Sequence, residues 1–266
     1  MTLVLVDVLD LPGDTTATNF EVRAPEHRLL LHGFPRRVRA LFAGEVVLDT
    51  RRGRLLRETG RLPVLYVPED DVRADLLDAG DRRTRCPFKG VASYWSLLVG
   101  ERRAENAVWA YPEPPDEAAW LRGHVAFDWD ALDAWFDEDE EVRGHLRDPF
   151  HRVDVRESSR HVRVTAHGEL VAETRRPKLL SETGLPNRYY VPPEDVRREL
   201  LQPSATHTDC PYKGTASYRT LQLGERRIPD AAWLYPEPLE DARKVRGHLC
   251  FMGEGVETTV DGERVA

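Results

Sequence analysis

A long segment occurs twice in this chain, and this internal repeat constrains the fold more than any other feature. Residues 27–127 align with residues 151–251 without a gap, and 48 of the 101 aligned positions are identical. Identity at this level over so long a segment indicates that both copies adopt the same fold. The 266 residues therefore contain two tandem homologous modules, in keeping with the usual size of protein domains.

The repeat also suggests where each part of the chain begins and ends. The expected parts are an N-terminal extension (1–24), the first module (25–127), an acidic connector (128–148), the second module (149–254) and a C-terminal tail (255–266). The connector is rich in tryptophan and contains the acidic run Asp137–Glu141. Such a composition favours a solvated helix or linker, with an acidic docking segment as the alternative.

Within each module the pattern is typical of short strands separated by turns. In the first module, Val38–Ala43 and Glu45–Thr50 flank Gly44 as a hairpin, and Leu62–Val67 continues the sheet. Pro68–Leu77 has acidic residues in its first turn and is expected to form a short capped helix, as is Pro193–Leu201 in the second module.

A second hairpin is expected after the cysteine loop, from Ala92–Val99 and Ala107–Tyr111. No alternation of strands and long helices occurs, and no Gly-x-Gly-x-x-Gly motif is found, which disfavours a parallel nucleotide-binding sheet. We therefore predict a mainly β protein with short helices, in which each module contains antiparallel sheets.

Charge and cysteine content exclude several functional classes. The formal net charge of −8 repels phosphate backbones and anionic membranes, so neither is an expected partner. The three cysteines form no Cys-x-x-Cys pair, which leaves no zinc ribbon and no disulfide framework and favours the reducing cytoplasm. No stretch is long and apolar enough to span a membrane, and no cofactor is indicated.

The repeated Cys-Pro-(Phe/Tyr)-Lys-Gly segment is the first candidate site. Proline fixes the chain after the cysteine, and glycine permits a sharp turn that can present side chains to a pocket. An ammonium three residues from a thiol could activate that thiol as a nucleophile, with a histidine as proton carrier. The catalytic candidates are thus Cys86, Lys89, His124, Cys210, Lys213 and His248. In the alternative, the cysteine is a small buried hydrophobe and the lysine forms a structural ion pair with Glu58 or Glu182.

Lysine is rare in this chain, and its placement is therefore informative. The four lysines are Lys89, Lys178, Lys213 and Lys244, whereas arginine supplies nearly every other positive charge. Lysine at both equivalent positions indicates a site that needs a compact ammonium, which a ligand anion, a carbonyl or a buried carboxylate would satisfy.

Aromatic residues recur beside the motif on adjacent expected strands, where side chains on one face can line a cavity. Core packing is the alternative for each of them. The ligand-binding candidates are Arg51, Glu58, Tyr66, Lys89, Tyr94, Trp109 and Tyr111 in the first module, and Arg175, Glu182, Tyr190, Lys213, Tyr218, Trp233 and Tyr235 in the second. Arg51 and Arg175 could grip an anion in a bidentate manner, or simply be solvated at a strand end. No metal site is expected, because close ligand spacing is missing.

These motifs together resemble the bacterial and fungal family called domain of unknown function 427. The resemblance covers both modules and rests on the Cys-Pro-(Phe/Tyr)-Lys-Gly-x-Ala-Ser-Tyr, Glu-Asn-Ala-x-Trp-x-Tyr-Pro-x-Pro and Gly-His-x-x-Phe segments. The first module keeps Trp95, Glu105 and Asn106 of the pattern. The second has Arg219, Pro229 and Asp230 instead, so the first is expected to be the functional copy.

The resemblance implies a β-tent-like domain of two antiparallel sheets, whose relatives hold zinc or an aromatic-lined pocket; the paired zinc cysteines are missing here. Our leading hypothesis is a protein that binds a small polar ligand in each module, with lysine meeting a ligand oxygen. The alternatives are an enzyme with Cys86 as nucleophile on a small acyl or carbonyl substrate, and a structural or interaction module. We expect a monomer with a pseudo-twofold pair of modules, or a homodimer.

Overall fold

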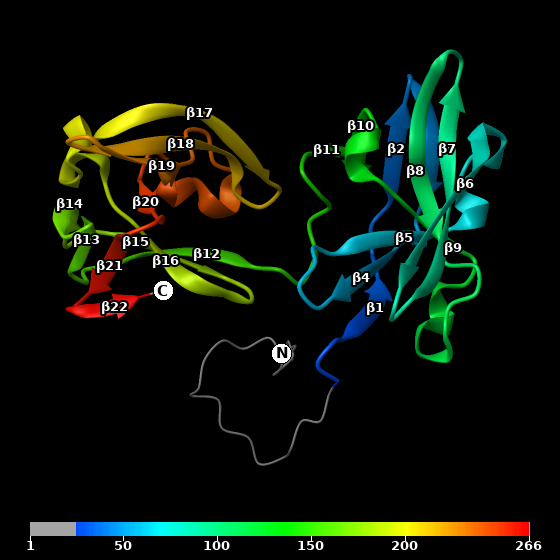
Figure 1. Ribbon diagram of the computed structural model, residues 1–266, viewed down its shortest axis with the longest axis horizontal. Helices are drawn as coiled ribbons and strands as arrows, with labels where there is room; N and C mark the ends of the chain where they lie inside the picture. Colours follow the sequence, from blue (N-terminus) through cyan, green and yellow to red (C-terminus); the bar gives the residue numbers. More distant parts are fainter. Residues whose placement is uncertain (1–24, 266) are drawn as a thin grey trace. The chain divides into compact units, whose positions relative to one another are not determined.

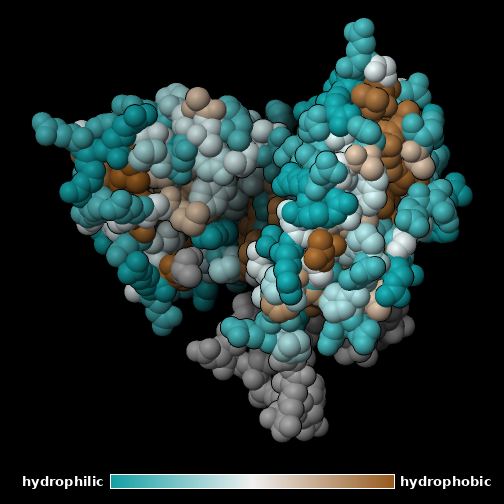
Figure 2. Space-filling model, turned by 45° about the vertical axis from the view of Figure 1, so that its right-hand side comes forward, coloured by the Kyte–Doolittle hydropathy of each residue, from teal (hydrophilic) through white to brown (hydrophobic). Residues whose placement is uncertain are grey.

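The computed structural model describes residues 25–265, which form two compact units, 25–149 and 150–265. Following the colours of Figure 1, the first unit runs from blue to green and the second from green to red. Every strand pairing among the described residues joins strands of the same unit. The face drawn in Figure 2 is mainly hydrophilic, with hydrophobic residues gathered in several places. The expected class, mainly antiparallel β with short helices in two repeated modules, is confirmed.

Two antiparallel sheets build the first module. The larger has the order β1-β4-β5-β9-β8-β7-β6 and the smaller β11-β10-β2-β3 (Figure 1). The strands are β1 (Leu29–Gly33), β2 (Val38–Phe42), β3 (Glu45–Thr50), β4 (Arg54–Glu58), β5 (Val64–Pro68), β6 (Leu77–Cys86), β7 (Gly90–Val99), β8 (Arg102–Ala110), β9 (His124–Phe127), β10 (Ala134–Asp137) and β11 (Glu140–Val142).

The second module repeats this plan. Its sheets are β12-β15-β16, β17-β18-β19-β20 and β14-β13-β21-β22, and a bridge between Val191 and Leu249 connects the first two in the way that β5 and β9 are connected in the first module. The strands are β12 (Val153–Glu157), β13 (Val162–Ala166), β14 (Glu169–Thr174), β15 (Lys178–Glu182), β16 (Leu185–Tyr190), β17 (Leu201–Cys210), β18 (Gly214–Leu223), β19 (Arg226–Leu234), β20 (Cys250–Phe251), β21 (Val256–Val260) and β22 (Glu263–Val265).

Inner strands of the larger sheet of the first module have a hydrophobic cluster on each face. Val38, Ala40 and Phe42 alternate along β2 and pack with residues of the larger sheet in the main core. On its opposite face a smaller cluster contains Tyr66 and Tyr111. The 3₁₀ helix η4 (Asp116–Leu121) contributes to this second cluster, as η8 (Glu240–Val245) does in the second module. The aromatic candidates Tyr66, Tyr94, Trp109 and Tyr111 belong to this second cluster.

The prediction of a helix at Pro68–Leu77 and at Pro193–Leu201 is wrong. The first segment forms two single 3₁₀ turns, η2 (Glu69–Asp71) and η3 (Ala74–Leu76), separated by an extended Val72 that bridges to Leu48 of β3. The second forms η6 (Pro193–Asp195) and η7 (Arg198–Leu200) in the same way. Pairing with the sheet buries the valine in the core, and this tertiary contact overrides the local helix signal.

The expected connector is neither a helix nor a linker. Residues 128–148 contain η5 (Trp129–Ala131) and the hairpin of β10 and β11, and β10 pairs with β2 of the first module. The expected tail, 255–266, likewise supplies β21 and β22, and β21 pairs with β13. Burial of Trp135 in the core provides the driving force for the first hairpin. The expected extension, 1–24, lies outside the described residues.

Candidate functional site

The repeated motif forms a tight loop between two long antiparallel strands. In the first module it connects β6 to β7 and ends at Gly90, whose φ is +93°. A β-carbon at this position would lie 3.1 Å from the carbonyl oxygen of Glu113. Gly214 has the same geometry in the second module. Glycine is therefore required here by backbone conformation and by close packing.

Replacing Gly90 by alanine should lower the free energy of unfolding of the first module by about 2 kcal/mol, because the backbone is strained and a carbonyl group must move. Gly100→Ala is the matched control, since that glycine also has a positive φ but would place its β-carbon in open space. We expect the control to cost about 1 kcal/mol. Urea unfolding of both variants measures the difference, and equal costs would contradict the packing argument.

The loop directs its lysine into the protein, where it meets a buried carboxylate. Lys89 Nζ donates a hydrogen bond to Glu58 Oε2, and the two side chains are only 9% and 4% exposed. His27 Nε2 lies 3.1 Å from the other oxygen of Glu58, and the His27 ring stacks on Phe88 with centroids 3.6 Å apart. The ammonium therefore has a structural partner, as the ion-pair alternative stated.

The second module repeats this cluster residue by residue. Lys213 Nζ donates to Glu182, and His151 Nε2 lies 3.0 Å from the second carboxylate oxygen. His151 contacts Tyr212, with ring centroids 4.2 Å apart. Sequence reasoning did not single out His27 and His151, although the identity of both histidines in the repeat was a usable signal.

The hydrogen bonds to Glu182 predict a pH dependence. Burial opposes the charge of Glu182, but hydrogen bonds from His151 and Lys213 outweigh it and hold the pKa of this carboxyl below its usual value of 4.5. A carboxyl whose pKa is lower in the folded state stabilises the fold above its unfolded pKa, and this stabilisation disappears as the pH falls through the folded pKa.

We therefore expect the free energy of unfolding of the second module to decrease as the pH falls below 4.5. Urea unfolding at a series of pH values, followed through the indole resonance of Trp233, measures this dependence. In the Glu182→Gln variant, the free energy of unfolding should decrease more gradually with falling pH than in the wild type. An unchanged slope in that variant would assign the acid sensitivity to other carboxyl groups.

The structure does not bring the catalytic candidates together. Cys86 ends β6, whereas His124 begins β9, and β7 and β8 lie between them. Three strand spacings amount to roughly 14 Å, which is far beyond the reach of direct proton transfer. His248 is separated from Cys210 in the same way, because it precedes β20. Since the lysines are held by Glu58 and Glu182, the proposed arrangement of thiol, ammonium and imidazole is not assembled.

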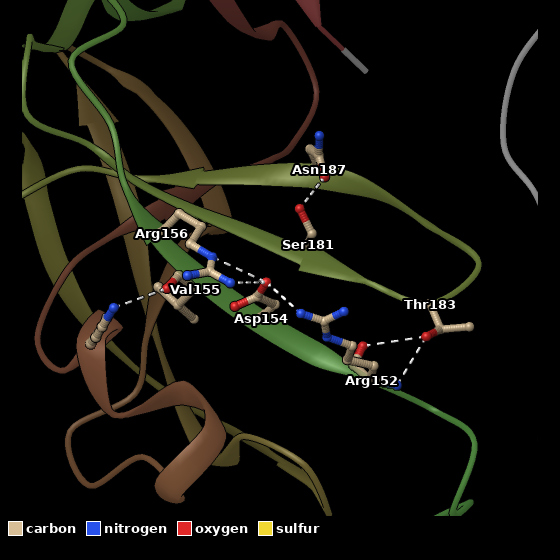
Figure 3. A network of polar contacts seen from close by, with 8 residues as sticks. Arg152, Asp154, Val155, Arg156, Ser181, Thr183 and Asn187 are labelled. Carbon is tan, nitrogen blue, oxygen red and sulfur yellow. Dashed lines mark hydrogen bonds and ion pairs between the residues drawn. The ribbon is translucent and has the colours of Figure 1, made fainter. Parts of the chain in front are cut away.

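In the second module most of the ligand-binding candidates surround one cavity. Its volume is about 220 Å³. Its lining residues are Leu180, Glu182, Leu185, Pro186, Arg188, Tyr190, Lys213, Tyr218, Trp233 and Tyr235. The strand alternation of β15 places Leu180 and Glu182 at the cavity. Figure 3 shows polar contacts of residues in and beside β12, β15 and β16. Among them, Asp154 accepts hydrogen bonds from Arg152 and Arg156.

Two tyrosines of this cavity, Tyr190 and Tyr235, keep their protons. Burial raises the pKa of Tyr190 and of Tyr235 well above the usual phenol value. Trp233 Nε1 donates to the Tyr190 hydroxyl over 3.2 Å, and the Tyr218 hydroxyl lies 3.0 Å from Thr208 Oγ1. The phenol hydroxyls give the cavity hydrogen-bond donors that can meet oxygen atoms of a ligand.

Arg188 is the cavity residue that sequence reasoning missed. It lies on β16 and is half-buried, and its Nη2 contacts the sulfur of Met252 at 3.8 Å. The equivalent position of the first module is Val64. The difference between the two copies at this position was the signal that could have indicated it.

The corresponding residues of the first module are packed differently. Tyr66 and Tyr111 are buried in a cluster to which Tyr94 and Trp109 add contacts, and burial raises the pKa of both buried tyrosines. Lys89 Nζ lies 5.7 Å from the centre of the Tyr111 ring. Trp109 also lines a separate cavity, together with residues after β9.

The two arginine candidates lie away from the aromatic clusters. Arg51 borders an open hollow of about 400 Å³ together with Arg37, Asp49, Thr50, Arg52 and Asp71. In that hollow Arg37 pairs with Asp49, and Arg52 pairs with Asp71. Arg175 is exposed and does not line the second-module cavity.

Residues that differ between the two copies lie where the pairing of two strands is irregular. Asn106 and Asp230 both have a φ of +52°, where the pairing of the adjacent strands shifts register. The Asp230 carboxylate accepts hydrogen bonds from Ser204 and Thr206 on β17. Glu105 accepts from Ser96 over 2.9 Å. These positions shape the long hairpins, so their differences do not mark the first module as the functional copy.

Two features are absent from the described residues: a cluster of potential metal ligands and a helix that could span a membrane. Nowhere in residues 25–265 do three His, Cys, Asp or Glu side chains gather as a metal site requires. The helices of the same residues are all too short or too polar to traverse a bilayer.

Comparison with known proteins identifies the repeated unit. No curated protein matches the sequence. A family model described as Domain of unknown function (DUF427) matches twice, over residues 30–138 and 154–262. Both matches extend past the expected ends of the modules and include β10 and β21, the first strands of the hairpins that follow β9 and β20. The chain therefore belongs to the DUF427 family and contains two copies of its domain.

Proposed function

We propose that this protein binds a small planar carboxylate in the cavity of the second module. One observation carries the proposal: six candidates chosen from the repeat, Glu182, Tyr190, Lys213, Tyr218, Trp233 and Tyr235, line a single cavity of about 220 Å³. Aromatic walls with a few polar groups are typical of small-molecule sites. The volume is below the roughly 300–1,000 Å³ of most ligand pockets, which favours a compact ligand.

Charge and hydrogen bonding favour a carboxylate. The Lys213 ammonium is paired with Glu182, and the other cation that lines the cavity is Arg188. Its planar guanidinium suits a carboxylate, and the hydroxyls of Tyr218 and Tyr235 can donate to the same oxygens. In this proposal Lys213 supports the cavity wall. The sequence analysis instead expected the lysine to contact the ligand. The three free thiols favour a reducing compartment, and we place the binding activity in the cytoplasm.

Benzoate is a suitable first probe, with benzamide as its neutral isostere. Benzoate should raise the melting temperature and should shift the indole resonance of Trp233, the single tryptophan of residues 150–265. Arg188→Gln should weaken benzoate binding by about 10-fold or more, because a charge-assisted hydrogen bond is lost. Arg226→Gln, on the exposed start of β19, is the control with the same change of charge.

A companion pair of variants separates the two modules. Tyr235→Phe should weaken benzoate binding by a few-fold, since one hydroxyl donor is removed. Tyr111→Phe changes the equivalent residue of the first module and should leave the affinity unchanged. The proposal fails if benzoate and benzamide bind equally well, or if Arg226→Gln weakens binding as much as Arg188→Gln.

A further inference from the structure

The first module contains a second and larger cavity, which lies outside the site proposed above. Its volume is about 410 Å³, within the usual range for ligand pockets. β4, β5, β8 and β9 contribute to it, together with the segment after β9 that was expected to be a connector. Its polar and aromatic lining residues are Trp109, Phe127, Asp128, Trp129, Asp130, Trp135 and His145.

The aromatic walls of this cavity are fixed by contacts with one another. Trp129 and Trp135 stack with centroids 4.4 Å apart and an interplanar angle of 7°. Phe127 meets the edge of Trp135 at 6.1 Å. Trp135 Nε1 donates to the carbonyl of Trp129 over 3.1 Å, so this indole N–H is already used. These rings therefore offer apolar surface and ring faces to a ligand, with little loss of side-chain freedom.

The charged groups of the cavity are all acidic. Asp128 and Asp130 are exposed members of the lining, and no lysine or arginine lines the cavity. The Asp128 carboxylate accepts a hydrogen bond from the backbone N–H of Asp130, which orients it. Within residues 25–265, neither carboxylate forms an ion pair. The negative charge at this rim is thus available to a ligand.

We infer that this cavity binds a small amine with an apolar or aromatic body. The ammonium would lie at the rim beside Asp128 and Asp130, and the body would pack against Trp109 and Trp129. Carboxylates with adjacent ring faces attract an organic cation both by charge and by cation–π interaction. A carboxylate ligand of the same shape would be repelled, so this site selects the charge opposite to that selected by the second-module cavity.

The second module provides an internal comparison. The positions equivalent to Asp128 and Trp129 are Met252 and Gly253, and the pairing with β13 places Thr258 where Trp135 pairs with β2. The hollow at the corresponding place is lined by Arg188 and Met252, and it has a volume of about 80 Å³. The amine site is therefore a property of the first module alone.

The experiment uses the full chain labelled with nitrogen-15 and titrated with phenethylamine. The six indole N–H resonances, assigned by single Trp→Phe substitutions, report where the probe binds. Saturable shifts at Trp109, Trp129 and Trp135 are expected, without a shift at Trp233. The carboxylate of nearly the same shape, 3-phenylpropionate, should not shift the first three.

A double variant tests the role of charge. Asp128→Asn with Asp130→Asn keeps an oxygen acceptor for the turn, and it should weaken phenethylamine binding by about 10-fold because two ionic contacts are lost. Asp81→Asn with Glu101→Gln is the control with the same change of net charge at exposed positions outside the cavity, and its affinity should match the wild type. Equal binding of amine and carboxylate at these tryptophans, no saturable shift there, or an equal loss in both double variants would overturn the inference.

Discussion

Lys89→Met should lower the free energy of unfolding of the first module by about 3–5 kcal/mol, the usual effect of removing one partner of a buried ion pair. The loss arises because Glu58, with a side chain only 4% exposed, is left with a charge that no ammonium compensates. Urea unfolding followed by tryptophan fluorescence measures it. Five of the six tryptophans lie in residues 25–149, so the signal mainly reports this module.

Two further variants separate the ion pair from simple loss of packing. Adding Glu58→Leu to Lys89→Met removes both charges, and it should recover at least half of the lost free energy. Lys213→Met should leave the first-module transition in place while it destabilises the second module, where Lys213 and Glu182 repeat the pair. A loss below about 1 kcal/mol for Lys89→Met would mean that the pair behaves like one on the surface.

Alkylation by iodoacetamide should discriminate strongly among the three thiols of the native protein. Cys250 is only 3% exposed, and burial raises the pKa of its thiol to about 12 from an ordinary value of 9.0. The thiolate is the reactive form, so a rise of this size lowers its abundance by about a thousandfold. Cys86 and Cys210 are half-buried. Both should react about a thousandfold faster than Cys250.

Peptide mass spectrometry over a time course gives all three rates from a single sample. In concentrated denaturant the three cysteines should react at similar rates, which controls for differences in peptide detection. Comparable native rates for Cys250 and Cys86 would show that the interior opens readily around β20. A Cys86 rate far above that of Cys210 would restore the nucleophile hypothesis, since the two loops share the same sequence pattern.

The parts of the fold that were predictable depend on local signals. The hairpin of β2 and β3 was expected, because short runs rich in apolar residues lie on both sides of Gly44. β6 was missed because its residues are mostly charged or small and it lies at a sheet edge, where neither face is buried. The hairpin of β10 and β11 was also missed, since its acidic residues are exposed and its stability comes from Trp135 in a core that sequence alone does not reveal.

The candidate site was predictable where the repeat retained residues and unpredictable where it did not. Lysine at positions 89 and 213 correctly indicated a compact ammonium, and the structure assigns its partner as a buried carboxylate. Arg188 occurs in one copy only, so a search for shared residues could not find it. The expected preference for the first module rested on Trp95, Glu105 and Asn106, where the second has Arg219, Pro229 and Asp230. The role of Asn106 and Asp230 in backbone geometry depends on a register shift between strands.

The pairing of β10 with β2, and of β21 with β13, has a consequence for how such a chain evolves. In each module the last hairpin returns to pair with the second strand of that module. A unit that completes its sheets from its own stretch of chain can be duplicated without taking strands from its neighbour. Each copy is then free to change separately, as Val64 and Arg188, or Trp129 and Gly253, illustrate. One ancestral scaffold could in this way acquire two sites of opposite charge preference within a single polypeptide.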